Sequence, residues 1–528
     1  MKNFIVYISF CANLFCFSVF NYSAYGQAGS PDVLFDGDGI VITDFNSLHD
    51  NSRKVLVQPD GKIVLVGWSG LNPLSDIALS RYNTNGSLDS TFGTGGRSTA
   101  SVHSNATGMA AVLQTDGKIV VAGMTDADTV AGTYDNNMLV FRFNSDGSVD
   151  SSYNSTGYNE IDLGSTMDKG FSIAIQQDGK TLMGGYTQLA GTTATVVVRF
   201  TTDGIVDSTF NADGILITDI PSSIYEQITC MLIQPDGKIV CGGQTGAGSN
   251  TNNMLMRILS DGTMDSTFNG TGIATYSWQS SQNTTSSIAL QGDGKIVLSG
   301  HSYINLDYKM CIERYDADGS IDSTFDQDGI VFPGFYFDSY GNAVLIQPDS
   351  SILVAGHVSP TPYDIGFARH LPDGTVDSSF GINGKLEMSL GTGNDYIYSL
   401  ALQNDGKIIA GGSTYNTSTA NLDFALLRLL NNLNVGIIDN EEQNNSLLIY
   451  PHPVAGSTTI EFTLLKAQKL SAFLFDNKGR LVRTFFSDRF TPEGMNKEQL
   501  NLENVAPGNY VLQLKNSSFQ LSIKIVIL

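Results

Sequence analysis

The chain repeats one segment, Gln58-Pro59-Asp60-Gly61-Lys62-Ile63-Val64-Leu65-Val66-Gly67, six more times in close copies, and this segment decides the fold. Every copy keeps a glutamine two residues before the aspartate and a glycine seven residues after it. The aspartates are spaced by 56, 62, 58, 57, 56 and 56 residues, at Asp60, Asp116, Asp178, Asp236, Asp293, Asp349 and Asp405. The chain is therefore a repeat protein of seven units.

Each copy of the segment predicts a β-hairpin. An Asp-Gly pair between two short apolar runs indicates a tight turn, because glycine accepts a positive φ. The run after the turn, Ile63-Val64-Leu65-Val66 in unit one, is apolar at every position. We expect such a strand to be buried on both faces. The glycine behind it indicates either a close approach of another backbone or a place where a side chain would block the middle of the assembly.

A second motif follows the hairpin in each unit. An arginine and, in the first six units, an aspartate eight residues later lie on either side of a turn such as Asn85-Gly86, so their side chains fall opposite each other across a hairpin. One binding site rarely needs a copy from every unit, so arginines in register favour structural ion pairs. The predicted pairs are Arg81 with Asp89, Arg142 with Asp150, Arg199 with Asp207, Arg257 with Asp265, Arg314 with Asp322, and Arg369 with Asp377.

The two ends of the repeat array predict a closed ring. Residues 32–41 match the second half of a unit without a first half, whereas residues 403–428 are a first half without a second. If the N-terminal half unit completes the last blade, Arg428 pairs with Asp32 and no strand edge remains exposed. The predicted fold class is all-β: a seven-bladed β-propeller with four strands per blade, closed by the N-terminal half unit, followed by a small C-terminal β-sandwich.

The repeats resemble those of the bacterial delta-60 repeat β-propeller proteins. That family carries a similar Gln-Pro-Asp-Gly-Lys-Ile core followed by an Asp-Ser-Thr-Phe-Gly tail, and both motifs recur here in order between about residues 31 and 430. Unit six departs from the pattern, with Asp349-Ser350-Ser351 in place of Asp-Gly-Lys. The resemblance implies a propeller fold and brings no established catalytic residues.

The C-terminal region alternates short strands with turns, which predicts a small β-sandwich. Its elements Gly479-Arg480-Leu481-Val482 and Pro507-Gly508-Asn509-Tyr510 are similar to those of the C-terminal sorting domain of the type IX secretion system, in which an asparagine usually stands where this chain has His452. The resemblance implies a Bacteroidota-type source and the type IX secretion machinery as a partner. It also implies removal of the tail or its attachment at the surface.

The remaining divisions follow from composition. Residues 1–26 predict a signal peptide, with Lys2, an apolar run, and then Ala24 and Gly26 before Gln27. A membrane anchor is the weaker alternative, because the apolar run is short and contains Asn13. No downstream stretch predicts a transmembrane segment. The predicted domains are the signal peptide (1–26), the propeller (27–430), a polar linker (431–446) and the sorting domain (447–528), and the predicted location is secreted or on the outer-membrane surface.

Charge and motifs exclude several chemistries. The net charge of −23 argues against binding nucleic acid or anionic membranes, which require basic patches. The six histidines show no metal-ligand spacing, and no nucleophile elbow or phosphate loop is present. Asp36-Gly37-Asp38-Gly39 and Asp326-Gln327-Asp328-Gly329 are rich in oxygen ligands, as calcium loops are. Because other units have Thr94-Gly95-Gly96 in the same place, turn chemistry explains both, and no cofactor is expected, with calcium as the alternative.

Two groups of residues have two interpretations each. Cys230 and Cys241 flank a turn almost symmetrically and could form a disulfide, but Cys241 occupies a core position of the repeat, which favours a buried free thiol. His301 and His357 directly follow the recurrent glycine. They either line one end of the central channel or are merely varied strand-end side chains. The residues at the same position in the other units are Trp68, Met124, Tyr186, Gln244 and Ser413.

Two classes of function remain open. The first is a secreted or surface-bound binding or scaffold module with an unknown glycan or protein ligand. The second is a secreted polysaccharide hydrolase or lyase with its site on one propeller face. An enzyme should show one blade with acidic and histidine residues that the others lack. The candidate is the loop of residues 125–137, with Asp126, Asp128 and Asp135, which shows nothing beyond a solvated loop. Binding is therefore favoured over catalysis.

Overall fold

A computed structural model describes residues 27–431 and 447–527, apart from 72–73, 104, 127–134, 248–249, 279–281, 360, 451–453, 455, 465, 477–479 and 517–519. The predicted signal peptide, almost all of the predicted linker, and His452 lie outside the described residues. The chain divides into two compact units, Met1–Leu433 and Asn434–Leu528. No helix among the described residues is long and apolar enough to cross a membrane.

Seven antiparallel sheets of four strands form the first unit, so the predicted seven-bladed propeller is confirmed. In each blade the hairpin segment joins the first two strands, the arginine of the Arg-Asp motif lies near the end of the third strand, and a short outer strand is the fourth. Blade one consists of β2 (His49–Val57), β3 (Ile63–Leu71), β4 (Leu74–Tyr82) and β5 (Arg97–Ala100); blade two of β6 (Ala106–Leu113), β7 (Ile119–Asp126), β8 (Asn136–Phe143) and β9 (Tyr158–Ile161); and blade three of β10 (Lys169–Ile175), β11 (Thr181–Leu189), β12 (Thr192–Phe200) and β13 (Ile215–Thr218). Blade four consists of β14 (Tyr225–Ile233), β15 (Ile239–Ala247), β16 (Asn250–Ile258) and β17 (Ile273–Tyr276), and blade five of β18 (Asn283–Leu290), β19 (Ile296–Ile304), β20 (Asp307–Tyr315) and β21 (Ile330–Val331). Blade six consists of β22 (Ser339–Ile346), β23 (Ile352–Val358), β24 (Asp364–His370) and β25 (Lys385–Met388), and blade seven of β26 (Asp395–Leu402), β27 (Ile408–Asn416), β28 (Asn421–Leu429) and the N-terminal β1 (Ile40–Thr43). A 3-10 turn, η1 (Tyr153–Ser155), follows the Arg-Asp motif of blade two.

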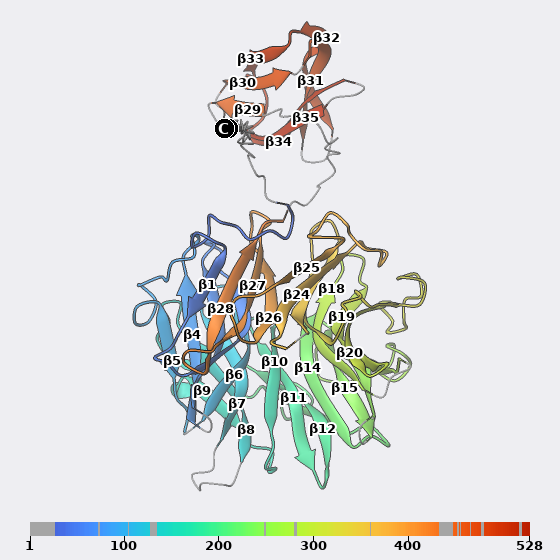
Figure 1. Cartoon of the computed structure of the whole chain (residues 1–528). Helices are drawn as coiled ribbons and strands as arrows, with labels where there is room; N and C mark the ends of the chain where they lie inside the picture. The colour runs from blue at the N-terminus through green and yellow to red at the C-terminus, as the bar shows by residue number, and fades with distance from the viewer. Residues whose placement is uncertain are drawn as a thin grey trace, which may run out of the picture. The chain divides into compact units, whose positions relative to one another are not determined.

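The N-terminal strand closes the ring. β1 pairs antiparallel with β28, with Ile40 opposite Leu427, and Figure 1 shows the blue β1 beside the orange β28. The backbone of Asp32 donates to Arg428 O at 2.8 Å, and Arg428 N donates to Gly39 O at 2.9 Å. The last blade is thus completed by the first described part of the chain, as the half units predict.

The recurrent glycine marks a close approach between two strands of one blade. A Cβ added to Gly67 would lie 1.9 Å from Asn51 O. A Cβ added to any of the six equivalent glycines would lie 1.7–2.0 Å from the equivalent carbonyl oxygen of its own blade. Directly opposite Gly67, β2 contains a β-bulge at Arg53, between Ser52 and Lys54. The absence of a side chain on the second strand therefore permits a bulge in the first strand of every blade, which re-aims one residue per blade.

The core of the propeller lies between neighbouring blades. The strand after each turn is fully buried, as at Ile63–Val66, and its apolar side chains pack against the next blade: Val64 and Ile77 of blade one share a cluster with Phe141 of blade two. The three described cysteines are free and buried, and Cys230 lies opposite Gly242 rather than Cys241. Cys230 and Cys241 are therefore buried free thiols of the core, not a disulfide. The shared clusters show that each blade buries its apolar side chains against its neighbours.

The second unit consists of two sheets around one apolar core, in agreement with the predicted β-sandwich. Its core includes Phe462, Leu474, Leu512 and Ile525. One sheet contains β29 (Leu447–Tyr450), β30 (Ser457–Leu464) and β33 (Gly494–Asn501), and the other contains β31 (Gln468–Asp476), β32 (Leu481–Thr491), β34 (Gly508–Lys515) and β35 (Gln520–Ile527).

Candidate functional site

The residues predicted as ion pairs lie in pairs at the turn of each Arg-Asp motif. In all seven blades the arginine Nε is 2.6–2.8 Å from the aspartate Oδ2, including the pair of Arg428 with Asp32. In six blades the lysine of the Asp-Gly-Lys turn also contacts the same aspartate, as Lys62 does with Asp89 at 2.8 Å. Blade six has Ser351 at that place, and Asp377 is correspondingly more exposed than its equivalents.

These pairs join neighbouring blades. Arg81 Nη1 donates to Ser145 O of the following blade at 2.5 Å, and its guanidinium lies 4.6 Å from the ring centroid of Phe92. Burial raises the pKa of Asp89, but hydrogen bonds from Lys62 and Thr91 and the charge of Arg81 outweigh burial and hold the pKa far below its usual value. With its partners on two blades, each arginine links neighbouring blades of the scaffold.

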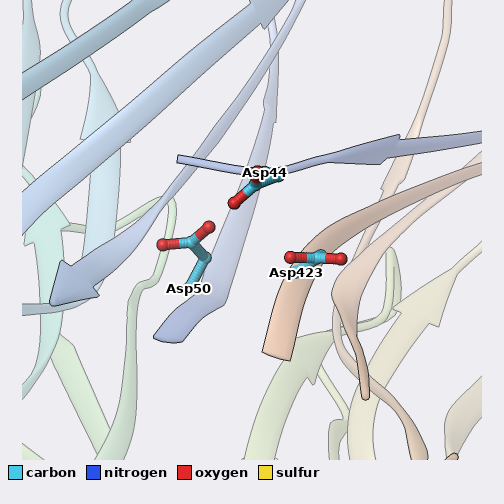
Figure 2. A group of neighbouring side chains, drawn as sticks. All are labelled: Asp44, Asp50 and Asp423. Atoms are coloured by element: carbon cyan, nitrogen blue, oxygen red, sulfur yellow. The ribbon is translucent and has the colours of Figure 1, made fainter. Parts of the chain in front are cut away.

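A group of three carboxylates, Asp44, Asp50 and Asp423, marks the seam between blades seven and one. Oxygens of the three residues lie within 4.8 Å of one another, and Figure 2 shows them approaching from three separate segments of the chain. Burial, together with the charges of Asp44 and Asp423, raises the pKa of Asp50 to about 7, although hydrogen bonds from Ser69 and the Phe45 N–H act to lower it. Among the described residues, this is the one acidic group with the spacing of a metal site.

Asp50 has a structural role that equivalent aspartates repeat in other blades, where no group of three carboxylates is found among the described residues. Asp50 Oδ2 accepts the N–H of Phe45 at 2.6 Å and so anchors the loop that enters blade one. Asp168 accepts the N–H of Leu163 at 2.7 Å in blade three, and Asp395 accepts that of Leu390 at 2.6 Å in blade seven. The acid therefore anchors the incoming loop, and its two acidic neighbours at the seam only make its ionisation harder.

The other acidic candidates form turns. Asp38 accepts the N–H of Ile40 at 2.9 Å and Asp328 that of Ile330 at 3.1 Å, as Asp213 does with Ile215 in a unit without the acidic loop. In the long loop of blade two, residues 127–134 with Asp128 lie outside the described residues. Asp126, at the end of β7, is buried.

An open groove of about 500 Å³ lies where blades four, five and six meet, and we call it the aromatic groove. Its three tyrosines and its histidine are half-buried. His301 lies edge-on to Tyr308 and Tyr340, with ring centroids 5.4 and 4.8 Å apart. The lining residues are Tyr225, Gln244, Thr251, Gln282, Thr284, His301, Tyr308 and Tyr340.

The line of rings continues from the groove across the next blades. Tyr340 stacks on His357 at 4.3 Å, His357 lies edge-on to Tyr396 at 5.0 Å, and Tyr396 stacks on Tyr398 at 5.9 Å. Burial lowers the pKa of His301 to about 4 and that of His357 to about 3, so both imidazoles are neutral at neutral pH. Of the residues that follow the recurrent glycine, His301 and Gln244 thus line the groove, and His357 lies in its continuation.

A second cavity, of about 390 Å³, lies among the first strands of all seven blades, and we call it the channel cavity. The bulge of each first strand supplies one lining residue, seven residues before the turn aspartate. These are Arg53, Met109, Phe171, Thr229, Ser286, Asn342 and Tyr398.

Blade one alone brings charge to the channel cavity. Arg53 Cζ lies 4.4 Å from the ring centroid of Tyr398, and Lys54 follows where other blades have alanine, serine or cysteine. Sequence reasoning missed this site. The available signal was the pair Arg53-Lys54 at positions where no other unit is charged.

The closed ring of four-stranded blades defines the first unit as a seven-bladed β-propeller. Its blades match the family described as "Domain of unknown function (DUF5122) beta-propeller", and residues 448–528 match the family described as "Secretion system C-terminal sorting domain". The chain belongs to the DUF5122 β-propellers and carries a type IX sorting domain, which indicates secretion or attachment at the cell surface. The matched repeats are residues 58–92, 114–153, 176–210, 234–268, 291–325, 347–380 and 403–435.

Three solved structures are distantly similar to the chain. Polysaccharide lyase Uly1 is 12% identical over 72% of this chain and 89% of its own, with a TM-score of 0.42. The PQQ-bound aldose sugar dehydrogenase of Streptomyces coelicolor is 11% identical over 74% and 98%, with a TM-score of 0.35, and Sqt1 of Chaetomium thermophilum is 14% identical over 60% and 71%, with a TM-score of 0.34. No curated protein sequence matches the chain significantly. Similarity at this level carries no argument about function.

Proposed function

We propose that this protein is an exported binding module that holds a glycan in the aromatic groove. The supporting observation is the run of half-buried rings from Tyr308 through Tyr340 to Tyr396, which crosses three blades. The apolar C–H face of a sugar ring packs on such rings, and a run of them suits an extended chain of sugars. The volume of the groove is in the range of ligand sites.

Polar groups at the groove complement sugar hydroxyls. Tyr308 donates to Gln282 Oε1 at 2.8 Å, and Gln244 donates to the Tyr225 hydroxyl at 3.2 Å, so amide and phenol groups are already oriented at the wall. A neutral imidazole at His301 offers both a donor and an acceptor. Recognition by rings and neutral polar groups needs no net charge and is compatible with the acidic surface of the protein.

Binding is favoured over hydrolysis by the composition of the groove. Glycoside hydrolysis uses a pair of carboxyl groups on either side of the scissile bond. Among the described residues that line the groove, none is an aspartate or a glutamate. The groove therefore provides contact surfaces without an acid and base.

The export scheme is part of the proposal. We infer that residues 1–26 are removed, that residues 27–430 form the mature binding module, and that residues 431–446 link it to the sorting domain at 447–528. The match of the tail to a sorting domain supports this division. In this scheme the tail serves export, and the propeller carries the binding function.

A glycan array tests the proposed function. We expect the purified protein to bind one class of glycan and the variant Tyr340→Thr to lose that binding. Threonine stands at the same repeat position in blades two and five, as Thr107 and Thr284, so the fold should tolerate the change. The control is Tyr158→Ile, a tyrosine on an outer strand where Ile40 and Ile215 stand in other blades. Binding that survives Tyr340→Thr, or no binding by the parent protein, would contradict the proposal.

A further inference from the structure

We infer that the channel cavity is a binding site for a small oxyanion, a carboxylate, phosphate or sulfate group, with Arg53 and Lys54 as its binding residues. This inference does not rest on the proposed glycan site, because it is carried by different residues and by charge.

The first argument is that Arg53 has no hydrogen-bond or ion-pair partner among the described residues. Its Nε is buried and has no hydrogen-bond partner, and within the described part of the chain its guanidinium takes part in no hydrogen bond or ion pair. The seven scaffold arginines, by contrast, are each paired with an aspartate. A guanidinium that is fixed over the Tyr398 ring but has no anion is preorganised for bidentate contact with an oxyanion.

The second argument is the asymmetry of the charge. The channel cavity is lined by first-strand residues of all seven blades, yet its described lining contains Arg53 and Lys54 and no carboxylate. The chain as a whole carries a net charge of −23. Two adjacent cations in the middle of an acidic protein form a local positive site that a small anion can neutralise.

The third argument is the environment of Lys54. Lys54 is half-buried and lines the channel cavity, and this burial lowers the pKa of its amine. An anion placed beside a half-buried ammonium group favours its charged form, so binding would offset the cost of its partial burial. Hydroxyl and amide groups of Ser286 and Asn342 line the same cavity and can donate to further oxygens of the anion.

The ring offers substitutions that keep the repeat geometry. Methionine occupies the bulge of blade two at Met109, so Arg53→Met removes the charge and keeps a residue that a bulge accepts. Serine follows the bulge in blade three at Ser172, so Lys54→Ser is equally conservative. Lys385→Ile is the control, because it removes one charge from an outer strand at a position where Ile215 stands in blade three.

Titration calorimetry on the full protein with inorganic phosphate, inorganic sulfate and glucuronate tests the inference. We expect the parent to bind at least one of them, Arg53→Met to weaken binding about tenfold or more, and Lys54→Ser to weaken it about threefold. Lys385→Ile should bind as the parent does. Binding of glucuronate alone would identify an acidic sugar as the source of the anion, whereas binding of phosphate or sulfate would identify a free inorganic ion.

Two results would overturn the inference: a parent protein that binds none of the three anions, and an Arg53→Met variant that binds as tightly as the parent. Circular dichroism melts of each variant establish that it is folded. If Arg53→Met does not fold, unchanged binding by Lys54→Ser would count against the site. Because Tyr340→Thr leaves Arg53 and Lys54 intact, it should still bind the anion, which separates this inference from the glycan proposal.

Discussion

Arg428 Nε lies 2.8 Å from Asp32 Oδ2, so an ion pair joins residues 396 positions apart in sequence. The pair has the same distance as Arg199 with Asp207 inside blade three. Arg428 also donates to Thr84 O of blade one at 2.5 Å, as every scaffold arginine but that of blade six does to a carbonyl of the next blade. The seam of the ring is therefore built from the same contacts as the junctions between continuous blades.

Replacement of Asp32 by alanine should destabilise the propeller as much as Asp207→Ala does. Both carboxylates are buried against an arginine, and removal of one partner leaves an unpaired buried charge, which costs on the order of 3 kcal/mol. Chemical denaturation of the two variants and the parent measures the loss. An Asp32→Ala variant as stable as the parent would show that the seam does not hold the ring closed.

The stability of the seam should depend on pH through Asp50. Its pKa is raised to about 7 by burial and by Asp44 and Asp423, so the stability it contributes is complete below the ordinary aspartate pKa and is lost as the pH rises through about 7. Asp50→Asn keeps the acceptor for the Phe45 N–H and cannot ionise. Its advantage in melting temperature over the parent, measured with a chelator present, should grow from pH 5 to pH 8. An advantage that does not change with pH would show that ionisation of Asp50 has no effect on folding.

Blade six should gain stability from Ser350→Gly. Ser350 has a φ of +68°, a conformation that costs a residue with a Cβ about 1 kcal/mol, whereas glycine stands at this turn in the other six blades. We expect the free energy of unfolding to rise by roughly that amount in a denaturant titration. The reverse change, Gly406→Ser at a φ of +86° in blade seven, should lower it similarly. Stabilisation by both changes, or by neither, would show that the turn is not strained.

The exported protein should lack the sorting tail or carry a modification on it. Its C-terminal 81 residues, 448–528, match a secretion-system sorting domain, which serves export. Intact-mass analysis of the protein from culture medium and from the cell surface gives its C-terminus. A freely secreted form that still ends at an unmodified Leu528 would contradict this prediction.

The sequence allowed the ring to be predicted because its determinants are local and repeated. The Asp60-Gly61 turn, the buried run after it and the Arg81 to Asp89 spacing are each readable within one unit, and the divided last unit indicates closure. For Gly67 the sequence leaves two interpretations, a close approach of another backbone or a place where any side chain would block the middle of the assembly. The structure shows the close approach and adds the bulge opposite it.

The candidate sites could be predicted only in part, because most of their residues come from different units and positions. The bulge residues share no chemistry, since Arg53, Met109 and Tyr398 have only the backbone geometry in common. The aromatic groove likewise combines Tyr308 of a third strand with Tyr340 of the first strand of the next blade. Only the curvature of the ring brings such residues together.

The crystal structure of the full protein with the glycan selected on the array tests the central claim most directly. The account predicts that sugar rings lie on the faces of Tyr308 and Tyr340, with hydroxyls near Gln282 and His301. A glycan bound to an outer strand or to the C-terminal unit, with the aromatic groove empty, would contradict it.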